Sequence, residues 1–134
     1  MKILSILKKP EAFAPVILRY GLSLLFLWFG FSQLLNAGAW ISWVPAWVPS
    51  LAHLGVDDIV ILNGSFEVIA GAFLAIGIWV RWTALILALH MFMIVFDIGL
   101  SAIGMRDLAI AFSTLSLATF GSDNYTLDSE VDNS

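Results

Sequence analysis

The sequence has no cysteine and very few charged side chains. Only 12% of its 134 residues are charged, whereas a soluble domain carries roughly 25%. So few charges cannot cover a surface that faces water. Without a thiol, the chain by itself cannot form a disulfide, carry out thiol exchange or hold an iron–sulfur cluster. Together these scarcities exclude an ordinary soluble domain and indicate a protein whose solvent is largely hydrocarbon.

Long uncharged runs make up most of the chain. Hydrophobic residues account for 60% of it, the mean hydropathy is +0.96, and no formal charge occurs between Tyr20 and Val56. A bilayer core of ~30 Å needs ~20 apolar residues per helix, so the chain can supply about four crossings. We therefore expect an all-α fold, an integral membrane four-helix bundle. Its predicted spans are residues 16–35, 59–79, 83–100 and 106–120.

The predicted spans divide the chain into three parts. Residues 1–14 form a cytoplasmic amphipathic segment whose lysines can reach lipid phosphates. Residues 15–121 form the transmembrane domain, with tight turns expected at residues 80–82 and 101–105. Residues 122–134 contain four acidic residues and no base, so we expect a disordered acidic tail.

The distribution of Lys and Arg predicts the orientation in the membrane. Lys2, Lys8, Lys9 and Arg19 lie in or near the N-terminal segment, whereas residues 36–58 contain no Lys or Arg. Because Lys and Arg accumulate on the cytoplasmic side, both termini are expected in the cytoplasm. The tryptophan-rich residues 36–58 are then expected on the outer face. The chain also lacks the basic stripe that nucleic-acid binding requires.

Seven polar residues lie in or at the ends of the predicted spans, all in the outer half of the bilayer. Glu67 lies inside the second span with Asn63 one turn earlier, and His90 lies inside the third. An ionisable group in a span costs several kcal/mol and is a candidate functional residue by default. The ligand-binding or proton-carrying candidates are Gln33, Asn63, Glu67, His90, Asp97, Arg106 and Asp107.

Two interpretations of these residues stay open. Buried polar side chains often join helices in small bundles, at ~0.6–2 kcal/mol each, and Arg106 can neutralise Glu67, Asp97 or Asp107. Alternatively, they line a ligand pocket in which Glu67 or His90 carries a proton. We expect no metal site, because one histidine with scattered carboxylates does not supply the three or four convergent ligands that a metal needs.

Three stretches resemble the DoxX-like family of small membrane proteins. They are residues 19–34 (RYGLSLLFLWFGFSQL), residues 67–81 (EVIAGAFLAIGIWVR) and residues 106–108 (RDL). The resemblance implies a four-helix bundle in the bacterial cytoplasmic membrane and a redox link. Relatives occur as the membrane subunit of thiosulfate:quinone oxidoreductases or beside other sulfur and oxidative-stress enzymes. Gln33 departs from the family, since many relatives are expected to carry lysine there.

The first functional hypothesis, drawn from this resemblance, is an accessory subunit of a quinone-linked redox system. If the chain belongs to an enzyme, it is expected to be at most a non-catalytic or quinone-interacting subunit of a membrane oxidoreductase. No covalently bound cofactor is expected, and quinone is the candidate ligand. The expected partners are the lipid bilayer, a membrane or periplasmic redox protein, and a second copy of the chain. The alternatives are a small transporter or a protein that binds a lipid or other small molecule, and a purely structural membrane anchor.

Overall fold

The computed structural model describes residues 9–128, and all regular structure in that range is helical. Four of its helices are long and apolar enough to cross a membrane, which confirms the all-α fold and the predicted number of spans. These four are α2 (Ala14–Leu35), α4 (Val56–Ile76), α5 (Val80–Ile98) and α6 (Ala102–Phe120). The shorter elements are η1 (Pro10–Phe13), η2 (Ala37–Trp43) and α3 (Trp47–Ala52).

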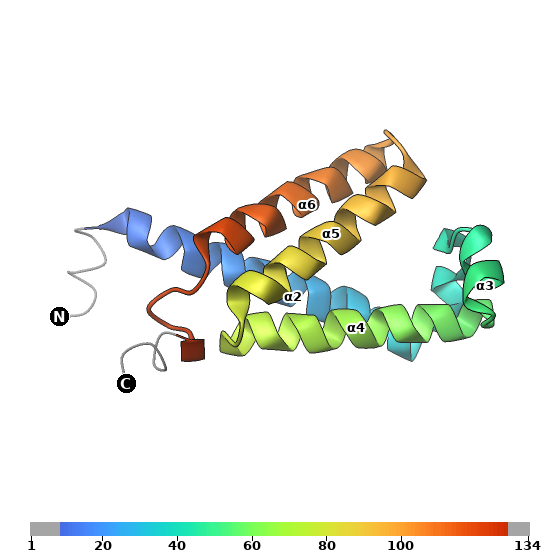
Figure 1. Ribbon diagram of the computed structural model, residues 1–134, viewed down its shortest axis with the longest axis horizontal. Coiled ribbons are helices and arrows are strands. Elements are labelled where there is room, and N and C mark those ends of the chain that lie inside the picture. Colours follow the sequence, from blue (N-terminus) through green and yellow to red (C-terminus); the bar gives the residue numbers. More distant parts are fainter. Residues whose placement is uncertain (1–8, 129–134) are drawn as a thin grey trace.

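The four long helices form two pairs. Helix α2 packs mainly on α4, and α5 packs mainly on α6. The pairs approach each other at the end of the bundle where α2 begins and α6 ends, and they diverge toward α3 (Figure 1). Large apolar side chains, among them Leu74, Leu87 and Leu117, fill the shared core. The bundle is therefore closed at one end and splayed at the other, which we call the α3 end.

Glycines allow α2 and α4 to approach closely. A Cβ atom at Gly30 would lie 2.7 Å from the carbonyl oxygen of Gly64, and one at Gly64 would lie 2.9 Å from Gln33 Cβ. Such small residues at a crossing are common in membrane helices, where close van der Waals packing drives association. This contact brings Gln33 of α2 against α4.

Two predicted turns are displaced in the structure. The chain turns at 77–79, not at 80–82, because Gly77 ends α4 with a φ of 78° and residues 80–82 already belong to α5. Glycine at this left-handed position is a common helix end. Helix α6 starts at Ala102, since the Ser101 hydroxyl accepts a hydrogen bond from Gly104 N at 3.0 Å and caps it. The fourth span is thus longer than expected.

The structure also differs from the disorder predicted for the acidic tail. Residues 121–128, which we call the strap, cross the closed end of the bundle, and Asp123 and Thr126 are buried there. The composition of the tail predicted disorder because it takes no account of a partner elsewhere in the chain. Residues 129–134 of the predicted tail and residues 1–8 of the predicted amphipathic segment lie outside the described residues.

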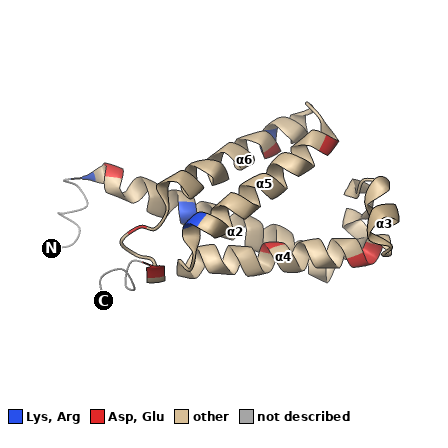
Figure 2. Cartoon of the chain, in the orientation of Figure 1, with Lys and Arg blue, Asp and Glu red and all other residues tan. Residues whose placement is uncertain are grey.

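Most charged side chains lie toward the two ends of the bundle, whereas Glu67 lies near the middle of α4 (Figure 2). Helices α2 and α6 have their outer termini at the same end, opposite α3. A chain with four crossings returns to the side from which it started. Which side of the membrane that is stays a prediction.

Candidate functional site

A cavity of about 1080 Å³ lies between the two helix pairs at the α3 end. All four long helices contribute to its wall, and residues of η2 and α3 complete it. The wall is mainly apolar, and Phe29, Phe92 and three tryptophans (Trp40, Trp43 and Trp47) line it. Ligand pockets in proteins are typically about 300–1,000 Å³, mostly apolar and furnished with a few polar groups. The cavity fits that description.

The cavity brings together every polar residue that the sequence identified as a candidate. Gln33, Asn63, Glu67, His90, Asp97, Arg106 and Asp107 all line it. They come from four helices and from positions up to 74 residues apart in the sequence. Their common location supports a shared role, and their participation in binding stays a prediction.

Glu67 is the centre of a hydrogen-bonded cluster of four residues, which we call the Glu67 cluster. Gln33 Nε2 donates to Glu67 Oε2 at 2.8 Å, and Asn63 Nδ2 lies 3.2 Å from Glu67 Oε1 and 2.7 Å from Gln33 Oε1. His90 Nε2 lies 3.4 Å from Glu67 Oε1, at the long end of the hydrogen-bond range. Only 5% of Glu67 is exposed. The cluster therefore joins α2, α4 and α5.

His90 reaches this cluster because α4 and α5 run antiparallel and bring similar depths of the two helices together. Its ring packs edge-on against Phe66, with the ring centroids 5.1 Å apart, and its side chain stays 21% exposed. The imidazole is thus in contact with the buried carboxylate and open to the cavity. The imidazole therefore connects the cavity with Glu67, and a proton-carrying role for this pair stays a prediction.

Arg106 pairs with its neighbour in the sequence, Asp107. Arg106 Nε and Nη2 each lie 2.8 Å from Asp107 Oδ1, and the Asp107 side chain is only 8% exposed. The guanidinium also lies 5.9 Å from the centroid of the Phe29 ring. Of the three partners considered from the sequence, the structure therefore selects Asp107.

Asp97 belongs to the outer part of the cavity. It is exposed, and its Oδ1 accepts a hydrogen bond from Trp47 Nε1 at 3.3 Å. This bond links the end of α5 to α3, which lies in the loop between the first two spans. The tryptophan-rich segment thus contributes directly to the wall of the cavity.

The side chains of the Glu67 cluster bond to one another, so the cluster joins the helices without needing a ligand. Across residues 9–128, no buried side-chain nitrogen or oxygen lacks a partner. In the same range no group of three or more histidine, aspartate or glutamate side chains could hold a metal ion. The arrangement is suited to binding an amphiphilic molecule, with rings or alkyl groups against the apolar wall and polar atoms facing the cluster.

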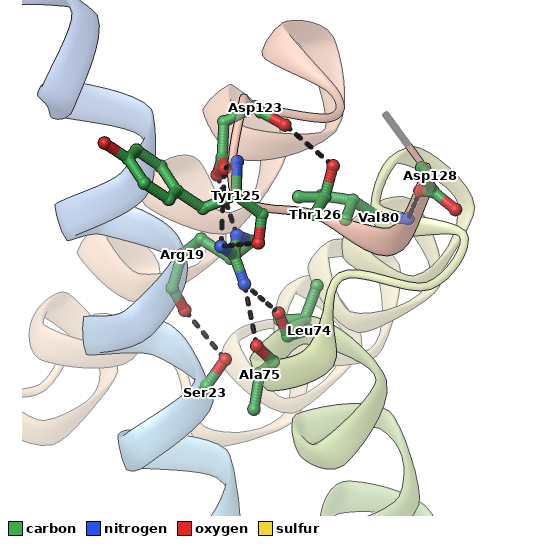
Figure 3. Close-up of polar contacts among 9 residues, drawn as sticks. All are labelled: Arg19, Ser23, Leu74, Ala75, Val80, Asp123, Tyr125, Thr126 and Asp128. Carbon is green, nitrogen blue, oxygen red and sulfur yellow. Dashed lines mark hydrogen bonds and ion pairs between the residues drawn. The ribbon is translucent and has the colours of Figure 1, made fainter. Parts of the chain in front are cut away.

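A second polar cluster lies at the closed end, and it was not identified as a site from the sequence. Arg19 is fully buried, and its Nε donates to Asp123 Oδ2 at 2.8 Å (Figure 3). Its Nη1 donates to the carbonyl oxygens of Leu74 at 2.7 Å and Ala75 at 2.9 Å, at the end of α4. Its Nη2 lies 3.3 Å from the carbonyl oxygen of Tyr125. The one available signal was an arginine within an apolar helix, which requires a partner.

The same strap also caps α5. Asp128 accepts hydrogen bonds from the backbone nitrogens of Trp79 at 2.8 Å and Val80 at 2.9 Å, where the helix has unpaired N–H groups. Through Arg19 and Asp128, the strap fastens α6 to α2, α4 and α5. The contacts of Arg19 and of the strap therefore hold the helices together at the closed end, and none of them lies at the splayed α3 end.

Comparison with known proteins bears on the fold and the first three spans. No curated protein and no solved structure matches the chain. The family model named DoxX matches residues 14–100, from the start of α2 to just beyond α5. The match covers more than half of the chain, and with its four apolar helices this protein is a multi-pass membrane protein of the DoxX family.

Proposed function

We propose that this DoxX protein is an accessory subunit of a quinone-linked redox system, of the kind that serves sulfur or oxidative-stress chemistry, and that it holds a quinone in the cavity at the α3 end. The observation that carries the proposal is the Glu67 cluster on the wall of a large apolar cavity. A site for an amphiphilic ring compound needs both features, and the two occur together here.

The residues of the cavity fit a quinone. A flat ring can pack against aromatic side chains such as Phe29 and Phe92, and an isoprenoid tail can follow the apolar wall between the helix pairs. Carbonyl oxygens need N–H donors, which His90 and the 54% exposed side chain of Arg106 can supply. When bound, a quinone supplies the exchange of two electrons and two protons.

The residues of this chain would position the ring and handle protons. His90 Nε2 faces Glu67 Oε1, so the pair can hold a proton close to a bound carbonyl oxygen. Gln33 and Asn63 keep the Glu67 carboxylate in place through their amide groups. The chain has no thiol to act as electron donor, so the donor in this proposal is another molecule. A membrane or periplasmic redox protein is the proposed partner, in the cytoplasmic membrane of a bacterium.

Gentle detergent purification followed by mass spectrometry of the co-purifying molecules and proteins tests this proposal. We expect a quinone or an oxidoreductase partner with the wild-type protein, and its loss in Glu67→Gln. That variant keeps the size of the side chain and an oxygen that can accept from Gln33. Glu11→Gln, an exposed residue of η1, is the matched control and should retain what the wild type retains.

Two outcomes would contradict the proposal. Ordinary lipid alone, identical in the wild type and in Glu67→Gln, would favour the structural anchor and leave the cluster as interhelical hydrogen bonding. We also expect Glu67→Leu to be inserted in the membrane. Near-wild-type abundance of Glu67→Leu together with full native function would rule out a functional role for Glu67.

A small transporter is the second candidate, because each helix pair packs mainly within itself. One pair could then move against the other and change the access to the cavity. A transporter needs two access states, whereas this structure is splayed at the α3 end and closed by the strap at the other. Proton-coupled uptake of a solute into vesicles that contain only this protein would favour this candidate.

A further inference from the structure

The charged groups of the cavity are not balanced. Three carboxylates line it, from Glu67, Asp97 and Asp107, and Arg106 is the one Lys or Arg side chain among the lining residues. With His90 neutral, the lining residues carry a formal charge of −2. In surroundings of low dielectric constant, an imbalance of this kind acts strongly on the charge of any occupant.

The positive charge of Arg106 does not offset the other two carboxylates. Its Nε and Nη2 both contact Asp107 at 2.8 Å, so this pair is locally neutral. Glu67 and Asp97 accept hydrogen bonds from neutral amide and indole groups, and His90 is the one side chain among these contacts that can become charged. An anionic occupant, such as a fatty acid or a phospholipid headgroup, would face two carboxylates, Glu67 and Asp97, that are not paired with a Lys or Arg side chain of the lining.

The remaining wall suits a cation with apolar substituents. Tryptophan rings attract cations through the negative faces of their π systems, by ~0.5–2 kcal/mol each. Trp40, Trp43 and Trp47 all line the cavity, and Trp47 is hydrogen-bonded to Asp97. A carboxylate and aromatic rings therefore meet at the outer part of the cavity, and apart from the Glu67 cluster the remaining wall is mainly apolar.

We propose that this cavity binds lipophilic organic cations, such as protonated amines or onium ions with aromatic substituents, and rejects anions of the same shape. This ligand class is separate from quinone. The inference rests on the proposed function only in requiring that the cavity is a ligand site. It makes Asp97 a selectivity residue for the charge of the ligand.

Tetraphenylphosphonium and tetraphenylborate test the inference, because both carry four phenyl rings around a single charged atom and their charges are opposite. Binding is measured by equilibrium dialysis of the purified full chain in a neutral detergent, with protein-free micelles subtracted. We expect specific binding of the phosphonium and none of the borate. Asp97→Asn should weaken phosphonium binding about tenfold, as expected for a charge ~10 Å away at an effective dielectric constant of ~20.

Two further variants sharpen the result. Asp97→Lys should abolish phosphonium binding, and this exposed position tolerates a change of charge. Glu11→Gln, which removes one negative charge at the other end of the bundle, should leave binding within about twofold of wild type, because screening limits charge effects to ~8–10 Å in salt. Equal binding of both ions to the wild type, or equal effects of Asp97→Asn and Glu11→Gln, would overturn the inference. If quinone still co-purifies in that case, the proposed function survives and only this inference fails.

Discussion

The buried ion pair between Arg19 and Asp123 allows a quantitative test of how the bundle is closed. Arg19→Leu removes the guanidinium and leaves an apolar side chain at this position of α2. Asp123 then stays buried, and its carboxylate keeps the hydrogen bond that the backbone nitrogen of Tyr125 donates to Oδ1 at 2.8 Å. The carbonyl oxygens of Leu74 and Ala75 lose their side-chain donor as well.

The structure indicates the size of the effect. Removing one partner of a buried ion pair typically destabilises a protein by ~3–5 kcal/mol, because it leaves an uncompensated buried charge. Removing both charges is often close to neutral when apolar residues fill the space. We therefore expect Arg19→Leu to lower the free energy of unfolding by ~3–5 kcal/mol. The double variant Arg19→Leu/Asp123→Leu should lose less than the sum of its single variants, by ~1–3 kcal/mol.

The assay is unfolding in mixed micelles with an increasing fraction of a denaturing detergent, followed by tryptophan fluorescence. Arg81→Leu is the matched control, because Arg81 is an exposed arginine at the same end of the bundle. An exposed substitution of this kind is expected to change stability by less than ~0.5 kcal/mol. The reasoning is refuted if Arg19→Leu costs no more than Arg81→Leu, or if the effects of the Arg19 and Asp123 substitutions add without coupling.

Two further predictions concern helix packing and the strap. Gly30→Ala should destabilise the bundle by ~1–3 kcal/mol, because its new Cβ atom would lie 2.7 Å from the backbone of α4. Gly21→Ala, with nothing within 4 Å of the added atom, is its control, and equal Tm values for both variants would contradict this. Asp128→Ala should cost ~0.5–2 kcal/mol by uncapping α5. Hydrogen exchange at Trp79 and Val80 should rise in it and stay unchanged in Asn124→Ala, an exposed neighbour in the strap.

Apolar runs in the sequence were sufficient to predict the number of spans and to identify the polar residues within them. Runs of apolar residues long enough to cross a bilayer indicate helices, because a backbone in lipid has to satisfy its own hydrogen bonds. Glu67 and His90 stood out for the related reason that an ionisable side chain in hydrocarbon is costly. In the structure the two side chains meet between adjacent antiparallel helices, with His90 Nε2 3.4 Å from Glu67 Oε1.

Helix boundaries and partner choice were less predictable. Residues 80–82 resembled a turn because they include an arginine between apolar runs, yet the positive φ of Gly77 and the cap from Asp128 start α5 at Val80. Likewise, the sequence permitted three carboxylate partners for Arg106. Asp107 is the neighbour of Arg106 on α6, whereas Glu67 and Asp97 lie on α4 and α5, and the sequence does not show how far those helices lie from Arg106.

Hydropathy and helix length are local properties of the chain, so they are enough to predict a bundle of four membrane-spanning helices with the seven candidate polar residues toward one end. Three-dimensional packing establishes the rest: those residues surround one cavity, the helices splay in two pairs, and Arg19 pairs with Asp123, 104 residues away in the sequence. These features depend on which surfaces pack together. A buried charge is stable only where a partner meets it in space, whatever the distance along the chain.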